Sequence, residues 1–187
     1  MAIDAFSHLF IRILLSLLVF TSCSKAPHSI KGYSPLSNKG RIYAEMYGSL
    51  AVEEMLRSGV PASIKLAQGI LASGYGVSFL ARHGNNHFGI KCHGWRGKKL
   101  YLDDDGEGDC FRVYASVQQS YRDHTIFLRN NRRYHFLFKL QTSDYHSWAY
   151  GLKRAGYATN PDYPGLLINI IERDRLYLYD SMTAQRL

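Results

Sequence analysis

The stretch VPASIKLAQGILASGYG, Val60 to Gly76, decides the fold. Pro61 suits the first turn of a helix, because its fixed backbone angle and missing N–H are tolerated there. Gly74 stands where a helix commonly ends in a left-handed residue. The stretch therefore predicts a helix, and its buried face is marked by Ile64, Ala67, Ile70 and Leu71. Ala72 lies in the last turn, at the edge of the apolar stripe.

Helices are predicted on both sides of this stretch. Residues 41–58 carry apolar side chains at roughly helical spacing and stop before Gly59. A short helical turn is predicted over residues 78–83. Further helices are predicted over residues 116–129, 131–139, 143–154 and 164–178.

One β-hairpin interrupts the helices. Residues 84–95 are too rich in Gly and Asn for a long element. Residues 98–103 and 110–114 have strand-like content, and the acidic run DDDGEGD (103–109) makes the turn between them. The predicted fold class is mostly α with a small β-hairpin lobe.

Length, composition and charge narrow the class of protein. The 187 residues suit one compact domain with a short leader, and 46% hydrophobic residues exclude a disordered chain. The net charge of +8 favours an acidic partner. Nucleic acid is disfavoured because the basic residues form no recognition motif and the N-terminus indicates export. They are scattered, as at Arg129, Arg132, Arg133, Lys139 and Arg154.

The N-terminus reads as an export signal. In residues 1–22, Arg12 precedes an apolar run that is too short to span a bilayer but fits a signal peptide. Small residues precede Cys23, as in the lipobox of bacterial lipoproteins, so we expect Cys23 to carry lipid. The alternative is an ordinary secretory signal with an incidental cysteine. Residues 23–39 would then be a tether, and residues 40–180 the domain, which we expect to be a monomer tethered to a bacterial membrane.

Two cysteines remain, Cys92 and Cys110, and they flank the predicted hairpin. An exported domain meets an oxidising compartment, which favours a disulfide over free thiols. A metal site would need more ligands at tighter spacing, and we expect neither a metal nor an organic cofactor.

Several runs of the chain match the signature of bacterial glucosaminidase domains, the endo-β-N-acetylglucosaminidases that cut peptidoglycan. The matching runs are VPAS (60–63), LAQ (66–68), LASG (71–74), NNHFGIKC (85–92), CFRVY (110–114), SY (120–121), DH (123–124) and GYATNP (156–161). The resemblance covers about residues 40–178. It implies a lysozyme-like α fold with a substrate groove, and hydrolysis of peptidoglycan at N-acetylglucosamine β-1,4 linkages.

Ala72 departs from that signature. The family has a glutamate there, the proposed general acid that protonates the leaving oxygen. Alanine is a good helix former, so nothing local requires the glutamate. Glu53, Glu54 and His87 are possible substitutes, although a solvated helix face and a structural loop are the simpler readings of these positions. The chain is therefore either a hydrolase that departs at its acid position or an inactive peptidoglycan-binding module.

The second carboxylate is expected on the hairpin. The family resemblance implies that one hairpin carboxylate faces the groove, and Asp103 or Asp104 fits best by position, with Asp105 third. A shift of one residue in strand register would exchange the faces, so the choice stays open. A solvated turn is the simpler reading for most of these acids, and the substrate's own acetamido group could serve instead.

Aromatic and polar residues complete the predicted site. Apolar faces of sugar rings stack on aromatic side chains, and hydroxyl and amide groups bond to their substituents. The predicted substrate-binding residues are Tyr75, Asn86, His87, Phe88, Trp95 and Tyr163. Tyr157 is assigned to the catalytic group, because the resemblance implies a site tyrosine there. Core packing is the alternative for the aromatic residues, above all for Phe88.

Overall fold

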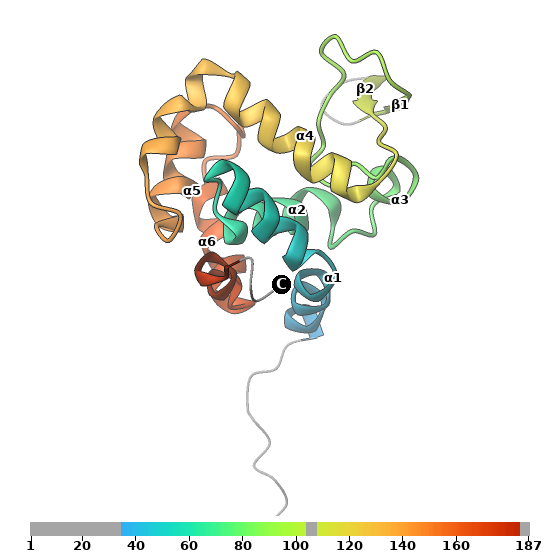
Figure 1. Ribbon diagram of the computed structural model, residues 1–187. Coiled ribbons are helices and arrows are strands. Elements are labelled where there is room, and N and C mark those ends of the chain that lie inside the picture. Colours follow the sequence, from blue (N-terminus) through green and yellow to red (C-terminus); the bar gives the residue numbers. More distant parts are fainter. Residues whose placement is uncertain (1–34, 104–107, 184–187) are drawn as a thin grey trace, which may run out of the picture. The chain divides into compact units, whose positions relative to one another are not determined.

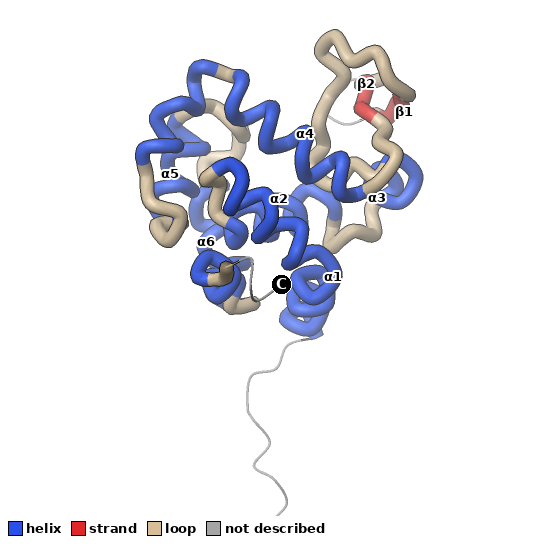
Figure 2. Tube along the Cα trace, viewed as in Figure 1, coloured by secondary structure: helices blue, strands red, loops and turns tan. Residues whose placement is uncertain are grey.

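The computed structural model describes residues 35–103 and 108–183, which belong to one structural unit (Figure 1). The predicted leader, Cys23, Asp104 and Asp105 lie outside the described residues. In chain order the elements are α1 (Pro35–Ser58), α2 (Ala62–Ser73), α3 (Phe79–Gly84), β1 (Lys99–Leu102), β2 (Asp109–Arg112), α4 (Val117–Asn130), the 3₁₀ helix η1 (Arg132–Lys139), α5 (Tyr145–Arg154), α6 (Tyr163–Arg173) and the 3₁₀ helix η2 (Leu176–Ser181). Helices make up most of this part of the chain, which confirms the predicted fold class (Figure 2).

Helix α2 is the buried centre of the unit. Ten of its 12 residues are buried, and it contacts α1, α5, α6 and η2. Gly74 ends it in the predicted left-handed conformation, and the Gly74 N–H donates to the Ile70 carbonyl. At the other end the Ser63 N–H donates to the Asp180 carboxylate across 2.8 Å, so η2 caps a helix 117 residues earlier in the sequence.

Three helix bounds differ from the predictions. Helix α1 begins at Pro35, earlier than the predicted residue 41, so it includes residues 35–39 of the predicted tether. The predicted last helix is divided: α6 ends at Arg173, and Arg175 takes a positive φ of 57° before η2 begins. A left-handed residue cannot continue a right-handed helix, which explains the break. Residues 132–139 form a 3₁₀ helix.

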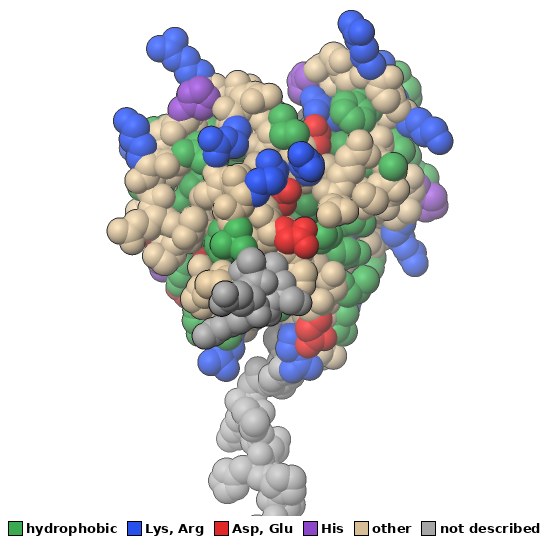
Figure 3. All heavy atoms as spheres, viewed as in Figure 1, with side chains coloured by type: hydrophobic (Ala, Val, Ile, Leu, Met, Phe, Trp, Pro, Cys, Tyr) green, Lys and Arg blue, Asp and Glu red, His purple; other side chains and the backbone are tan. Residues whose placement is uncertain are grey.

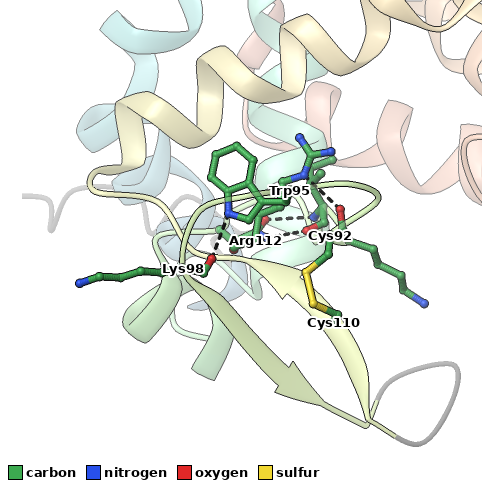
Figure 4. The surroundings of a disulfide bond; sticks show 8 residues. Cys92, Trp95, Lys98, Cys110 and Arg112 are labelled. Atoms are coloured by element: carbon green, nitrogen blue, oxygen red, sulfur yellow. Dashed lines mark hydrogen bonds between the residues drawn. A yellow bond between two sulfur atoms is a disulfide. The ribbon is translucent and has the colours of Figure 1, made fainter.

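The hairpin pairs β1 with β2 antiparallel, with Tyr101 opposite Cys110. The loop before it runs alongside β2, because the Cys92 N–H donates to the Cys110 carbonyl and the Arg112 N–H to the Ile90 carbonyl. Cys92 and Cys110 are joined by a disulfide (Figure 4). The covalent bond thus holds the Gly- and Asn-rich loop against the hairpin.

Two features of the described residues concern the surface of the domain. Lys and Arg side chains are spread over separate parts of the face shown in Figure 3. None of the described helices is long and apolar enough to cross a membrane.

We predict that the disulfide stabilises the domain by about 3 kcal/mol, the amount expected for a closed loop of roughly 20 residues. Denaturant unfolding of the Cys92→Ala/Cys110→Ala variant measures this loss. Reductant should lower the stability of the natural chain to that of the variant and leave the variant unchanged. Equal stability of the natural chain and the variant in the absence of reductant would contradict the prediction.

Candidate active site

Ala72 is exposed in the last turn of α2, directly before a tight turn. Gly74, Tyr75 and Gly76 all have positive φ, between 55° and 80°. The buried Ser73 hydroxyl holds this turn: it donates to the Gly69 carbonyl and accepts the Gly76 N–H across 2.7 Å. A Cβ at Gly76 would meet the rings of His87 and Tyr43 at 3.4 Å, an ordinary van der Waals contact, so it is the positive φ that favours glycine there. The turn that follows position 72 is therefore fixed by its backbone conformation and by the hydrogen bonds of Ser73.

One face of α2 leads from the interior to Ala72. Lys65, Gln68 and Ala72 are spaced by three and four residues and so lie along one side of the helix. Lys65 and Gln68 are buried. The Gln68 amide donates to the Tyr163 hydroxyl across 2.9 Å, and the Lys65 ammonium donates to the Tyr121 carbonyl across 2.7 Å.

Tyr157 and Tyr163 stack beside this face, with ring centroids 5.7 Å apart. Tyr163 is buried and bonded to Gln68, whereas Tyr157 is only partly buried. The Tyr157 hydroxyl lies 3.0 Å from His124 Nε2. Burial raises the pKa of both tyrosines, so both hydroxyls stay protonated at neutral pH. The structure thus brings these two predicted residues to the α2 face that ends at Ala72.

His87 is a poor candidate for a proton donor. It is 2% exposed, and its Nδ1 lies 2.8 Å from the Tyr43 hydroxyl. Burial lowers the pKa of His87 to about 4, so the ring is neutral and has no acidic proton to give at neutral pH. The His87 ring lies next to Gly76 in the turn.

Asn86 and Phe88 also face inward. The Asn86 amide donates to the carbonyls of Ile90 and Arg112, and its oxygen accepts the Ile90 N–H. The Phe88 ring lies parallel to His124 at 4.1 Å. Both are nearly fully buried. Asn86 therefore holds the loop and Phe88 packs on the His124 ring, while sugar contacts of these two residues, of His87 and of Tyr163 stay predictions.

Trp95 is half-buried on the hairpin side (Figure 4). Its indole N–H donates to the Lys98 carbonyl across 3.0 Å, and the Arg112 guanidinium lies 5.2 Å from the ring. Arg112 in turn pairs with Asp123 at 2.8 Å. Trp95 thus helps to attach the hairpin to α4, and a sugar would have to share the ring with Arg112.

The described carboxylates of the hairpin and the two glutamates considered on α1 are exposed or paired with other groups. Asp103 is exposed and accepts the Gly108 N–H across 2.8 Å, which shapes the hairpin turn. Asp109 pairs with Lys91 at 3.0 Å. On α1, Glu53 is exposed and Glu54 pairs with Arg57. The hairpin carboxylate stays a prediction that rests on Asp103, Asp104 and Asp105.

Tyr75 opens onto a pocket of about 370 Å³ between the turn and α1. The pocket is lined mainly by apolar and aromatic side chains, with Lys39 and Arg82 also present. The Tyr75 hydroxyl lies 3.5 Å from the Arg173 guanidinium. Within residues 35–103 and 108–183, no group of three His, Cys, Asp or Glu side chains is placed to bind a metal.

Sequence reasoning missed Lys65 altogether, although a lysine between Ile64 and Leu66 on a mostly apolar helix is an unusual signal. His124 and Gln68 fell inside matched runs but received no role. Their importance depends on partners from distant segments, which no local pattern shows.

This fold and this site define a glucosaminidase-type domain. The chain belongs to the Glucosaminidase family, described as mannosyl-glycoprotein endo-beta-N-acetylglucosaminidase, whose model matches residues 48–176.

Relatives agree with that assignment. The chain is 34% identical to the peptidoglycan hydrolase FlgJ of Vibrio parahaemolyticus over 62% of this chain and 41% of that protein. It is 29% identical to the exo-glucosaminidase LytG of Bacillus subtilis over 92% of this chain and 64% of that protein. The crystal structure of a peptidoglycan hydrolase from Sphingomonas sp. A1 superposes with a TM-score of 0.64 at 26% identity, covering 77% of this chain and 97% of that one. The chain thus spans less than two thirds of the length of these two curated relatives.

We predict that the stability of the domain rises with pH because of Lys65. Burial lowers the pKa of Lys65 from 10.5 to about 7. Between these values the unfolded chain binds one proton more than the folded chain, so the free energy of unfolding rises by up to about 1.4 kcal/mol per pH unit. Below pH 7 both states are protonated and this contribution is flat.

Urea unfolding of the natural chain and of Lys65→Met, at several pH values between neutral and about pH 10, isolates the effect. The free energy of unfolding of the natural chain should increase relative to that of Lys65→Met as pH rises. The exposed Lys99→Met variant serves as the control and should follow the natural chain. Parallel curves for the natural chain and Lys65→Met would disprove the assignment.

Proposed function

We propose that this domain binds glycan strands of peptidoglycan and is a glucosaminidase-type hydrolase whose acid position is occupied by Ala72. The reaction is hydrolysis of β-1,4 linkages at N-acetylglucosamine. The observation that carries the proposal is the intact frame around position 72: the turn held by Ser73, the inward face of α2, and the paired tyrosines beside it.

Chemistry at the site depends on a proton donor. Cleavage of a glycosidic bond requires protonation of the leaving oxygen, usually by a carboxylic acid. A methyl group cannot donate a proton, and the loss of general acid catalysis typically costs about 10²–10⁴-fold in rate. Tyr157 has a raised pKa and is a poor acid, although it can still donate a hydrogen bond.

The second candidate function is a binding module without turnover. Ala72 favours it directly. Of the possible substitutes, Glu53 is exposed, Glu54 pairs with Arg57, and His87 is a neutral, buried ring. Such a module would keep the glycan contacts and position other wall enzymes. Both candidates predict glycan binding, and only turnover separates them.

We expect Ala72→Glu to raise turnover of purified peptidoglycan by at least tenfold over the natural chain. The new carboxyl would occupy the end of α2 where the family places its acid. New reducing ends and the fragments seen by mass spectrometry measure the reaction. Ala72→Gln has nearly the same shape but no acidic proton, and it is the matched control that should stay at the natural level.

A natural chain that is already fast, with no gain from Ala72→Glu, would place the acid elsewhere. Equal gains from glutamate and glutamine would mean that packing and not proton donation limits the reaction. Either result removes Ala72 from the acid position.

We also propose that the chain is exported and anchored to a membrane through lipid on Cys23. The signal-like residues 1–22 and the small residues before Cys23 support this proposal. A membrane anchor would keep the domain beside the cell wall, the compartment in which a peptidoglycan strand is found.

Cys23→Ser should move the protein from the membrane fraction to the soluble fraction when both are expressed in a bacterium. Incorporation of a labelled fatty acid should disappear with it. Cys92→Ser, which also removes one cysteine, is the control and should keep its membrane partitioning. Unchanged partitioning and labelling of Cys23→Ser would refute lipidation at this residue.

A further inference from the structure

Three polar groups form a line from the core toward the candidate site. Lys65 on α2 is fully buried, and its Nζ lies 3.3 Å from His124 Nδ1 on α4. The other ring nitrogen, His124 Nε2, lies 3.0 Å from the Tyr157 hydroxyl. The line therefore runs from Lys65 through His124 to Tyr157, and only Tyr157 is partly exposed.

Packing fixes the ring between the two partners. Phe88 lies parallel to His124 at 4.1 Å with an interplanar angle of 10°, and Tyr157 meets the ring edge-on. Each nitrogen of His124 therefore keeps one partner. Lys65 is held as well, because its ammonium donates to the Tyr121 carbonyl and lies 5.3 Å from the Phe88 ring.

The charge of Lys65 decides where the ring proton lies. An ammonium group has donors only, so His124 Nδ1 must be the acceptor of this pair. A neutral imidazole with a free lone pair on Nδ1 carries its proton on Nε2. His124 then donates to the Tyr157 oxygen, and the Tyr157 proton is left for another acceptor.

We propose that Lys65 is a positioning residue that fixes the proton of His124 on Nε2 and thereby makes the Tyr157 hydroxyl a hydrogen-bond donor to an acceptor oxygen of the glycan. The acetamido carbonyl and the ring hydroxyls of N-acetylglucosamine are oxygens of this kind. The inference rests on the proposed function, since it takes Tyr157 to contact the glycan.

Deprotonation of Lys65 would release this constraint. A neutral amine can accept as well as donate, so His124 Nδ1 could carry the proton and Nε2 could accept from Tyr157. Burial brings the pKa of Lys65 to about 7; Glu54 on α1 opposes this shift, and Arg57 adds to it. Burial and the Lys65 charge keep the pKa of His124 well below 6.5, so His124 stays neutral and Lys65 is the group that changes. The line thus responds to pH near neutrality.

The proton position can be read directly, without any glycan. We would record long-range ¹⁵N–¹H spectra of the full chain, in which the two imidazole nitrogens of His124 report which of them is protonated. The natural chain should show Nε2–H below pH 7 and a shift toward Nδ1–H above it. Lys65→Met should lose this preference at every pH, and the control Lys99→Met should keep it.

Glycan affinity supplies the second readout. A tetramer of β-1,4-linked N-acetylglucosamine is titrated into each protein by calorimetry below pH 7. Tyr157→Phe should weaken binding about fivefold to tenfold, the worth of one hydrogen bond. Lys65→Met should weaken binding about twofold, because about half of the His124 rings then carry their proton on Nδ1. The double variant should bind no more weakly than Tyr157→Phe, because Lys65 acts only through the Tyr157 donor.

The outcomes separate this inference from the proposed function. If Lys65→Met keeps the proton on Nε2, or loses it without weaker binding, the inference is overturned. If the natural chain binds no tetramer while its spectra behave as expected, the glycan function fails and the proton arrangement stands. Thermal unfolding verifies that Lys65→Met is folded. If the variant is unfolded, the pH titration of the natural chain tests the inference by itself. A proton position on His124 that does not change with pH then overturns the inference.

Discussion

The near-complete burial of α2 is the constraint on which the rest of the structure depends. A buried helix is stabilised when its polar side chains are paired, since each unpaired buried group costs about 1–3 kcal/mol. The Lys65 ammonium and the Gln68 amide nitrogen find partners on α4 and in Tyr163 of α6, whereas the Gln68 amide oxygen and the Ser63 hydroxyl have none among the described residues. The same bonds that make burial tolerable therefore hold α4 and α6 at the face of α2 that ends at position 72.

The residues that fix the backbone around position 72 are different from the residue at position 72 itself. The turn depends on Ser73 and on the two glycines after it, and the layer below depends on Gly69, where a side chain would collide with the Tyr43 hydroxyl at 2.3 Å. Ala72 itself is exposed, and exposed substitutions usually change stability by no more than about 0.5 kcal/mol. The fold therefore tolerates alanine or glutamate at this exposed position, which is why membership of the family is compatible with Ala72.

Much of the fold could be predicted because its signals are local. Pro61 and Gly74 bracket α2, turn residues separate the two strands, and the matched runs of the family signature lie in order along the chain. The site was less predictable. Asn86, His87, Phe88 and Tyr163 are residue types that suit a sugar site, yet all four are buried in the structure. Composition cannot distinguish a ring that faces a ligand from a ring that faces the core, since both require the same chemistry.

The sequence by itself determined the helical class, the hairpin, the family, and the absence of a carboxyl group at position 72. These depend on residue identity and on spacing along the chain. Only the tertiary structure decided that Lys65 lies beside His124 and that His124 reaches Tyr157, residues separated by 59 and 33 positions. Their pairing follows from how α2 and α4 pack against each other and against the segment that carries Tyr157, and the proton arrangement of the site follows from that pairing.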